Sequence, residues 1–151
     1  MTQRPRLLAA ALALFLGASA PAWATASLTC DGNDRNLSFE FLGNVGSGDG
    51  GSIQLIGGAI KLKAVRGKFD ATEFNIGPDH IAGHWSFGKE LRIGIAPDAV
   101  GDVSVFLAII AEQAKSAAGD MERYRGSYVL KVRAPKGESE LKGKLKGCDV
   151  G

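Results

Sequence analysis

Two histidines, His80 and His84, are the residues with the clearest capacity for metal or acid–base chemistry. An HxxxH spacing suits a metal ion when both residues lie one turn apart on a helix. Here Gly83 and the alternating residues around it favour a strand, on which positions four apart are separated by about 13 Å. That separation is too long for two imidazoles to share one zinc ion. The sequence therefore predicts solvent-facing histidines near a turn, with no metal site and no cofactor.

Motifs for nucleophilic catalysis and for phosphate or calcium binding are incomplete in this chain. None of its serines lies in G-x-S-x-G, although a triad can assemble in space without a local motif. The glycine-rich residues 43–51 precede a strand-like segment and lack Gly-Lys-Ser/Thr, so they indicate a hairpin loop. Residues 31–34 match part of a calcium loop without its distal glutamate. These absences favour a non-catalytic protein.

Basic side chains are concentrated near the C-terminus. Residues 123–146 contain eight of them against only Glu138 and Glu140, namely Arg123, Arg125, Lys131, Arg133, Lys136, Lys142, Lys144 and Lys146. Period-two alternation predicts that Lys131 and Arg133 share one face of a strand. The same alternation places Lys142, Lys144 and Lys146 on one face of the next strand.

These last five residues form a candidate basic patch, defined as Lys131, Arg133, Lys142, Lys144 and Lys146. Such a patch suits an anionic surface, such as polysaccharide or lipid headgroups, or an acidic protein. The alternative is an ordinary polar outer face, whose lysines prevent edge strands from pairing. Two features argue against nucleic acid as a partner: the predicted export signal at residues 1–24 and the lack of an aromatic–basic stacking pattern.

The first 24 residues have the features of an export signal. Arg4 and Arg6 precede an apolar run at residues 7–16, and Ala22-Trp23-Ala24 supplies a small-x-small cleavage site. Ten helical residues rise only about 15 Å, half the thickness of a bilayer core. The sequence therefore predicts a cleaved signal peptide at 1–24 and a periplasmic or secreted protein with no membrane span. Residues 25–151 would form a single β domain with equal numbers of basic and acidic residues.

The two cysteines, Cys30 and Cys148, lie close to the two ends of that domain. In an oxidising compartment an even pair is typical of a disulfide. Because bonded cysteines have Cα atoms roughly 4.4–6.8 Å apart, the first and last elements must be neighbours. Such proximity is expected when a sheet closes into a barrel.

Most of residues 25–151 alternate between apolar and polar side chains, as in strands with one buried face. Leu37, Phe39 and Phe41 show the pattern, and Gly57-Gly58 shifts its phase by one residue, which indicates a bulge. Turn residues separate the runs at 65–67, 77–79, 88–89 and 135–137. The prediction is a mainly β fold, an antiparallel meander of about eight strands forming a small barrel or sandwich.

One segment departs from this alternation. From Val103 onward the apolar residues fall at helical offsets, with Asp102 as an N-cap and Gly119 as a C′ residue. The favoured interpretation is one helix near 102–118. The alternative makes residues 103–110 a strand.

These observations indicate a binding module for a small apolar ligand or an anionic envelope component. The binding site would be either the basic patch or the barrel interior, lined by Phe39, Phe41, Trp85 and Tyr128, although a filled core would also contain such aromatics. The alternatives are a small hydrolase, or a structural or inhibitor protein of the cell envelope. Fold class alone does not choose between them.

Overall fold

The computed structural model describes residues 25–46, 51–63, 68–115 and 121–151. The predicted signal peptide at 1–24, the turn at 65–67 and Gly119 lie outside these ranges. No helix in the described part of the chain is long and apolar enough to cross a membrane.

The described residues form ten antiparallel strands and one short 3-10 helix. In chain order these are β1 (Ala26–Asn33), β2 (Leu37–Val45), β3 (Ile53–Leu62), β4 (Glu73–Ile76), η1 (Pro78–His80), β5 (Ile81–Phe87), β6 (Glu90–Ile95), β7 (Ser104–Gln113), β8 (Glu122–Ala134), β9 (Gly137–Lys144) and β10 (Gly147–Val150). The mainly β, antiparallel prediction is therefore confirmed.

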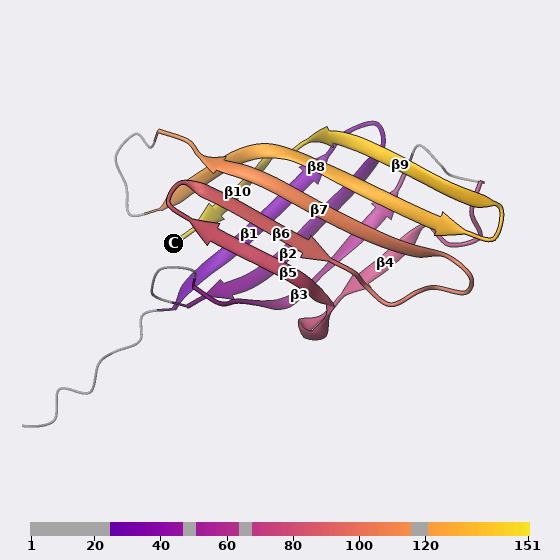
Figure 1. Cartoon of the computed structure of the whole chain (residues 1–151), viewed down its shortest axis with the longest axis horizontal. Coiled ribbons are helices and arrows are strands. Elements are labelled where there is room, and N and C mark those ends of the chain that lie inside the picture. The colour runs from indigo at the N-terminus through magenta and orange to yellow at the C-terminus, as the bar shows by residue number, and fades with distance from the viewer. Residues whose placement is uncertain (1–24, 47–50, 64–67, 116–120) are drawn as a thin grey trace, which may run out of the picture.

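The sheet curls into a half-barrel (Figure 1). Its strand order is β4-β3-β2-β1-β10-β8-β7-β6-β5, and β9 pairs with β8 beside this path. The two end strands, β4 and β5, are joined only by the short η1 segment, so the ends of the sheet must approach each other. At the seam between β3 and β5, the backbone N–H of Ile53 donates to Nε2 of His84 at 3.4 Å.

The termini of the domain meet, as the cysteines predict. β1 pairs with β10, and Cys30 lies directly opposite Cys148 in that pairing. The two residues form a buried disulfide with a Cα–Cα distance of 4.1 Å. The crosslink therefore joins the N-terminal and C-terminal halves of the sheet.

β8 is the longest strand and pairs with two successive strands along one edge. β9 pairs with its second half, through the predicted turn at 135–137, and β10 pairs with its beginning. Gly137 ends the turn with φ 126°, a left-handed conformation that glycine adopts without a Cβ penalty. Leu145 and Lys146 form the break between β9 and β10, so β9 leaves the curled sheet as a side branch.

Inward-facing alternate residues fill the interior of the curled sheet. Phe39 stacks against Phe41 with ring centroids 6.3 Å apart, and packs edge-on against Tyr128 at 5.6 Å. All three rings are buried within the hydrophobic core. They therefore contribute to packing, whereas Trp85, which was expected beside them, lies on the outer face and is 49% exposed.

The predicted bulge in β3 lies directly beside the glycine pair Gly57-Gly58. The register between β2 and β3 shifts at Leu42/Gly43, opposite the extra residue Ile56. A Cβ at Gly58 would collide with the β2 backbone at Glu40 and Phe41. Only glycine permits this close approach of β3 to β2.

The helix predicted near 102–118 is wrong, because residues 104–113 form strand β7. Val105, Leu107 and Ile109 point into the core, as a strand requires. The outward residues Phe106 and Ile110 are apolar as well. Apolar side chains on both faces obscured the period-two alternation, which is why helical offsets appeared to fit.

A hydrogen-bonded pair joins the β1–β2 turn to β8. The hydroxyl of Tyr128 donates to Oδ2 of Asp34 at 2.6 Å, and the backbone N–H groups of Asn36 and Leu37 donate to Oδ1. Burial alone would raise the pKa of Asp34, but these hydrogen bonds and nearby Lys63 lower it overall. Burial, together with Asp34, raises the pKa of Tyr128.

We expect Tyr128→Phe to lower the free energy of unfolding by about 1–3 kcal/mol at pH 7, because a bond to a charged acceptor is lost. The pKa of Asp34 is depressed on folding. Its stabilising contribution is therefore present above the unfolded-state pKa and lost as pH falls through the folded-state value. Urea unfolding of both proteins at pH 7 and pH 3 checks this, since the difference should shrink at pH 3. An equal difference at both values would contradict the role given to ionised Asp34.

Candidate functional site

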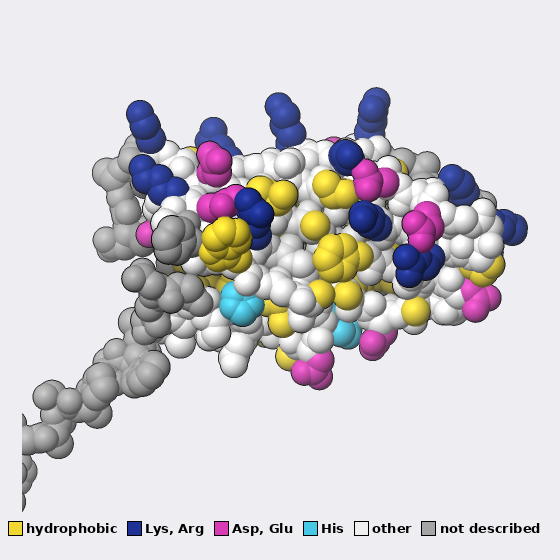
Figure 2. All heavy atoms as spheres, viewed as in Figure 1, with side chains coloured by type: hydrophobic (Ala, Val, Ile, Leu, Met, Phe, Trp, Pro, Cys, Tyr) yellow, Lys and Arg dark blue, Asp and Glu magenta, His cyan; other side chains and the backbone are white. Residues whose placement is uncertain are grey.

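Exposed apolar side chains gather on the outer wall of the half-barrel. Trp85 on β5 is 49% exposed, and Phe106 and Ile110 on β7 are 39% and 46% exposed. Figure 2 shows hydrophobic side chains gathered on this face, with basic and acidic side chains interspersed beside them. Single exposed apolar residues are ordinary, whereas a cluster of them marks a binding surface.

These side chains border a groove that runs across the strands. We call it the aromatic groove and define it by its outward residues Gly83, Trp85, Arg92, Gly94, Phe106, Ala108 and Ile110. Its volume is about 390 Å³. Gly83, Gly94 and Ala108 occupy directly paired positions on β5, β6 and β7, so a row of small residues forms its floor. In the next row, Trp85, Arg92 and Ile110 form one wall.

Phe106 is held close to the floor of the aromatic groove. Its Cζ atom would lie 3.1 Å from a Cβ placed at Gly94. A larger residue at Gly94 would therefore push the ring away from the backbone. Because Gly94 has no side chain, the Phe106 ring lies close to the sheet while 39% of Phe106 stays exposed.

The wall formed by Trp85, Arg92 and Ile110 contains a cation whose position is fixed. The guanidinium carbon of Arg92 lies 5.0 Å from the centre of the Trp85 ring. Nε and Nη2 of Arg92 both donate to Oε1 of Glu90, at 2.9 and 2.6 Å. Cation–π contact and the ion pair together restrict the Arg92 side chain. Trp85 and Arg92 are thus positioned before any ligand binds.

The candidate basic patch adjoins the aromatic groove on β8 and β9. Lys131, Arg133, Lys142 and Lys144 all lie on exposed positions of these paired strands. Ala108 pairs with Val129, and Val129 pairs with Lys142, so the floor of the groove leads directly toward the patch. Lys146 lies apart from them, in the break between β9 and β10.

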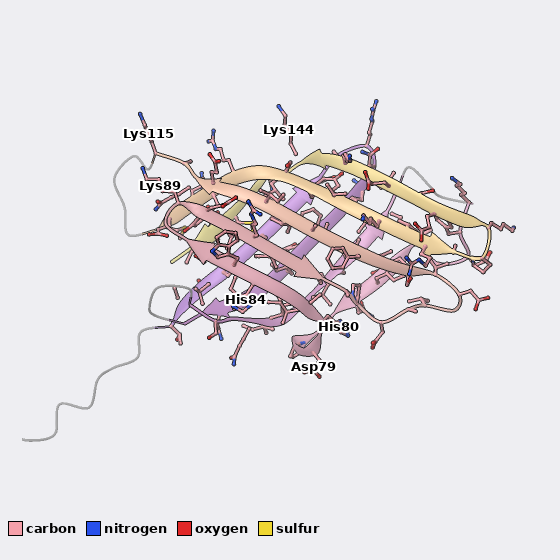
Figure 3. All side chains as sticks on the ribbon, in the orientation of Figure 1. Asp79, His80, His84, Lys89, Lys115 and Lys144 are labelled. Atoms are coloured by element: carbon pink, nitrogen blue, oxygen red, sulfur yellow. A yellow bond between two sulfur atoms is a disulfide. The ribbon has the colours of Figure 1, made fainter. Side chains whose placement is uncertain are left out.

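Acidic neighbours neutralise much of the basic patch. Arg133 pairs with Glu138 at 2.7 Å, Lys142 with Glu140 at 2.8 Å, and Lys146 with Asp31 at 3.0 Å. The hydrogen bond and charge of Lys142, with a smaller effect of Lys131, lower the pKa of Glu140. Within the described residues, Lys131 and Lys144 form no ion pair, and Figure 3 shows Lys144 pointing away from the sheet.

A second groove lies on the outer face of β1, β2 and β3. It has a volume of about 510 Å³, and its lining includes Asp31, Glu40, Lys61 and Lys146. Lys61 pairs with Glu73 at 3.1 Å and Lys146 pairs with Asp31, so most of its charges are already matched. The rest of its lining includes glycines and the exposed Leu42, and its two phenylalanines, Phe39 and Phe41, are buried, so the described residues form no cluster of exposed aromatics there.

The two histidines lie on different elements and make separate contacts. Nδ1 of His80 in η1 accepts the backbone N–H of Gly77 at 2.9 Å, and its Nε2 lies 3.4 Å from Asp98. His84 on β5 contacts Ile53 at the seam, and Figure 3 shows both side chains. In the described part of the chain, neither histidine hydrogen-bonds a serine hydroxyl. The same residues contain no group of three or more His, Cys, Asp or Glu placed to hold a metal ion.

Sequence reasoning missed the aromatic groove, although one signal for it was present. Phe106 and Ile110 lie in a segment that is apolar at both odd and even positions. In a half-buried strand the solvent face is normally polar. A strand that is apolar on both faces, with Trp85 two strands away on β5, indicates a second surface that excludes water.

Comparisons with models of known families, with curated proteins and with solved structures found no match for this chain. Its function is therefore inferred from its own geometry.

Proposed function

We propose that this protein is an exported, non-catalytic binding module that holds an anionic envelope component on its outer wall. The observation that carries the proposal is the aromatic groove, where Trp85 on β5 and Phe106 and Ile110 on β7 are exposed together on the two strands that flank β6. Lys131 and Lys144 adjoin it on β8 and β9. Apolar contact in the groove would supply affinity, and the lysines would favour a negatively charged ligand.

Two further observations support this choice of surface. The interior aromatics Phe39, Phe41 and Tyr128 pack against one another, so they serve the core. The disulfide between Cys30 and Cys148 suits an oxidising compartment, in agreement with the proposed export. The small hydrolase and the structural or inhibitor protein stay as alternatives, and a panel of hydrolase substrates tests the first of them.

Binding to an isolated cell-envelope fraction tests the proposal. We expect the double variant Trp85→Ser/Phe106→Ser to bind at least tenfold more weakly than the unchanged chain, because the apolar contact area is removed. Binding should also weaken as salt is raised, since exposed charges are screened. Cosedimentation with the envelope fraction over a range of protein concentrations measures both effects.

A matched control is available on β2 and β3, outside the aromatic groove. Leu42 and Ile56 are 47% and 57% exposed, and neither belongs to the aromatic groove. Leu42→Ser/Ile56→Ser removes comparable apolar surface and should leave binding unchanged. Equal binding by the groove variant and the unchanged chain would refute the proposal.

A further inference from the structure

We propose that the ligand of the aromatic groove is an acidic polysaccharide, a chain of uronic-acid sugars lying across strands β5 to β9. This inference rests on the proposed function and names the ligand class of the same site. Sugar rings would stack on Trp85 and Phe106, and their carboxylates would meet Lys131 and Lys144. The direction, the depth and the charge of the groove each favour such a ligand.

The groove runs in a direction that suits an elongated chain. Its floor passes through Gly83, Gly94 and Ala108, and the same row of cross-strand pairs continues beyond the groove through Val129 to Lys142. Five neighbouring strands span about 19 Å at the usual spacing between strands. Because Gly83, Gly94 and Ala108 are small, a polymer can follow the floor over β5, β6 and β7 without meeting a side-chain barrier.

The depth of the groove favours sugar rings over a fully apolar ligand. Pockets for small apolar ligands bury roughly 70–90% of the ligand surface, whereas this groove is open along the face of the sheet. A sugar ring has one apolar face and a polar edge. It can therefore stack on an exposed aromatic ring while its hydroxyl groups remain in water. Phe106, lying low over Gly94, offers such a ring beside Trp85.

The charge around the groove favours an acidic sugar over a neutral one. Arg92 forms part of one wall, and Lys131 is the cross-strand partner of Phe106. Ser127 on β8 pairs with Ile110 on one side and with Lys144 on the other. Lys144 therefore lies at the end of the cross-strand row that begins at Trp85. Glu90 and Glu140 balance Arg92 and Lys142. Lys131 faces Glu140 across the β8–β9 pair but forms no ion pair with it among the described residues. Lys131 and Lys144 are therefore the cations we assign to the sugar carboxylates.

The fluorescence of Trp85 can measure ligand binding in the aromatic groove. The chain has two tryptophans, Trp23 and Trp85, so a chain carrying Trp23→Phe reports on the groove alone. We expect polygalacturonate to change the Trp85 emission with a saturable dependence on concentration. Neutral dextran should give no change, because it has no carboxylate for Lys131 and Lys144 to bind. No response to polygalacturonate, or an equal response to neutral dextran, would overturn the inference.

Two variants that keep Trp85 test the stacking contact. Phe106→Ala removes the ring, and Gly94→Val displaces it by occupying the space beneath, so each should weaken polygalacturonate binding at least tenfold. Ile56→Ser is the control and should have no effect. Unchanged binding by both groove variants would overturn the inference. If polygalacturonate fails while Trp85→Ser/Phe106→Ser still loses envelope binding, the ligand class is wrong and the proposed function stands.

Discussion

Replacing Cys30 and Cys148 with alanine is expected to lower the free energy of unfolding by about 4–5 kcal/mol. The disulfide joins residues separated by 118 positions, and the chain-entropy model gives a contribution of this order for a loop of that length. Without the crosslink, the unfolded chain gains conformational freedom while the native pairing of β1 with β10 is retained. Urea unfolding of the variant and the unchanged chain measures the difference.

The alanine variant also creates a small cavity, because both cysteines are buried. Reduction of the unchanged chain separates the two effects, since it removes the crosslink and keeps both sulfur atoms. We expect the reduced protein to account for most of the loss. If reduction leaves the unfolding midpoint unchanged, the disulfide does not limit the freedom of the unfolded chain.

Gly126→Ala is expected to lower the free energy of unfolding by about 3 kcal/mol or more, as overpacking against backbone is poorly relieved. Gly126 on β8 pairs with Ala111 on β7. A Cβ at this position would collide with the carbonyl oxygen of Ile110 and lie 2.6 Å from Cα of Ala111. Both contacts are with the main chain, so a side-chain rotation cannot relieve them. The two strands would have to separate where the sheet curls.

Gly83→Ala is the matched control for this substitution. Gly83 also lies in a strand, but a Cβ there meets nothing within 4 Å. We expect a change within about 0.5 kcal/mol, as for an ordinary surface substitution. Thermal and urea unfolding of both variants make the comparison. Similar losses at the two positions would mean that glycine itself, and not the close approach of β7 and β8, determines the result.

Much of the fold was predictable because the information is local. The alternation around Phe39 and Phe41 identifies strands, since one face of each is buried. Gly57-Gly58 and the turn at 135–137 are local backbone signals, and both lie where expected. The exception is β7, where outward Phe106 and Ile110 hide the alternation that Val105 and Leu107 would otherwise show.

The candidate site was less predictable because it depends on pairing between strands. Lys131, Arg133, Lys142 and Lys144 do lie on the outer face, as their spacing predicts. Their neutralisation by Glu138 and Glu140 depends on which residues face each other across β8 and β9. Trp85 was assigned to the interior because the register shift between Ile81 and Gly83, after which it faces outward, depends on the pairing of β5 with β6.

The sequence by itself therefore determined the class of fold, the disulfide that joins its ends and the outward position of the lysines. Each follows from residue type and short-range periodicity. The tertiary structure alone decided that the end strands β4 and β5 are brought together through η1, and that Trp85 and Phe106 border one groove. The physical reason is that strand register and sheet curvature are set by contacts between residues far apart in the chain, which no local pattern encodes.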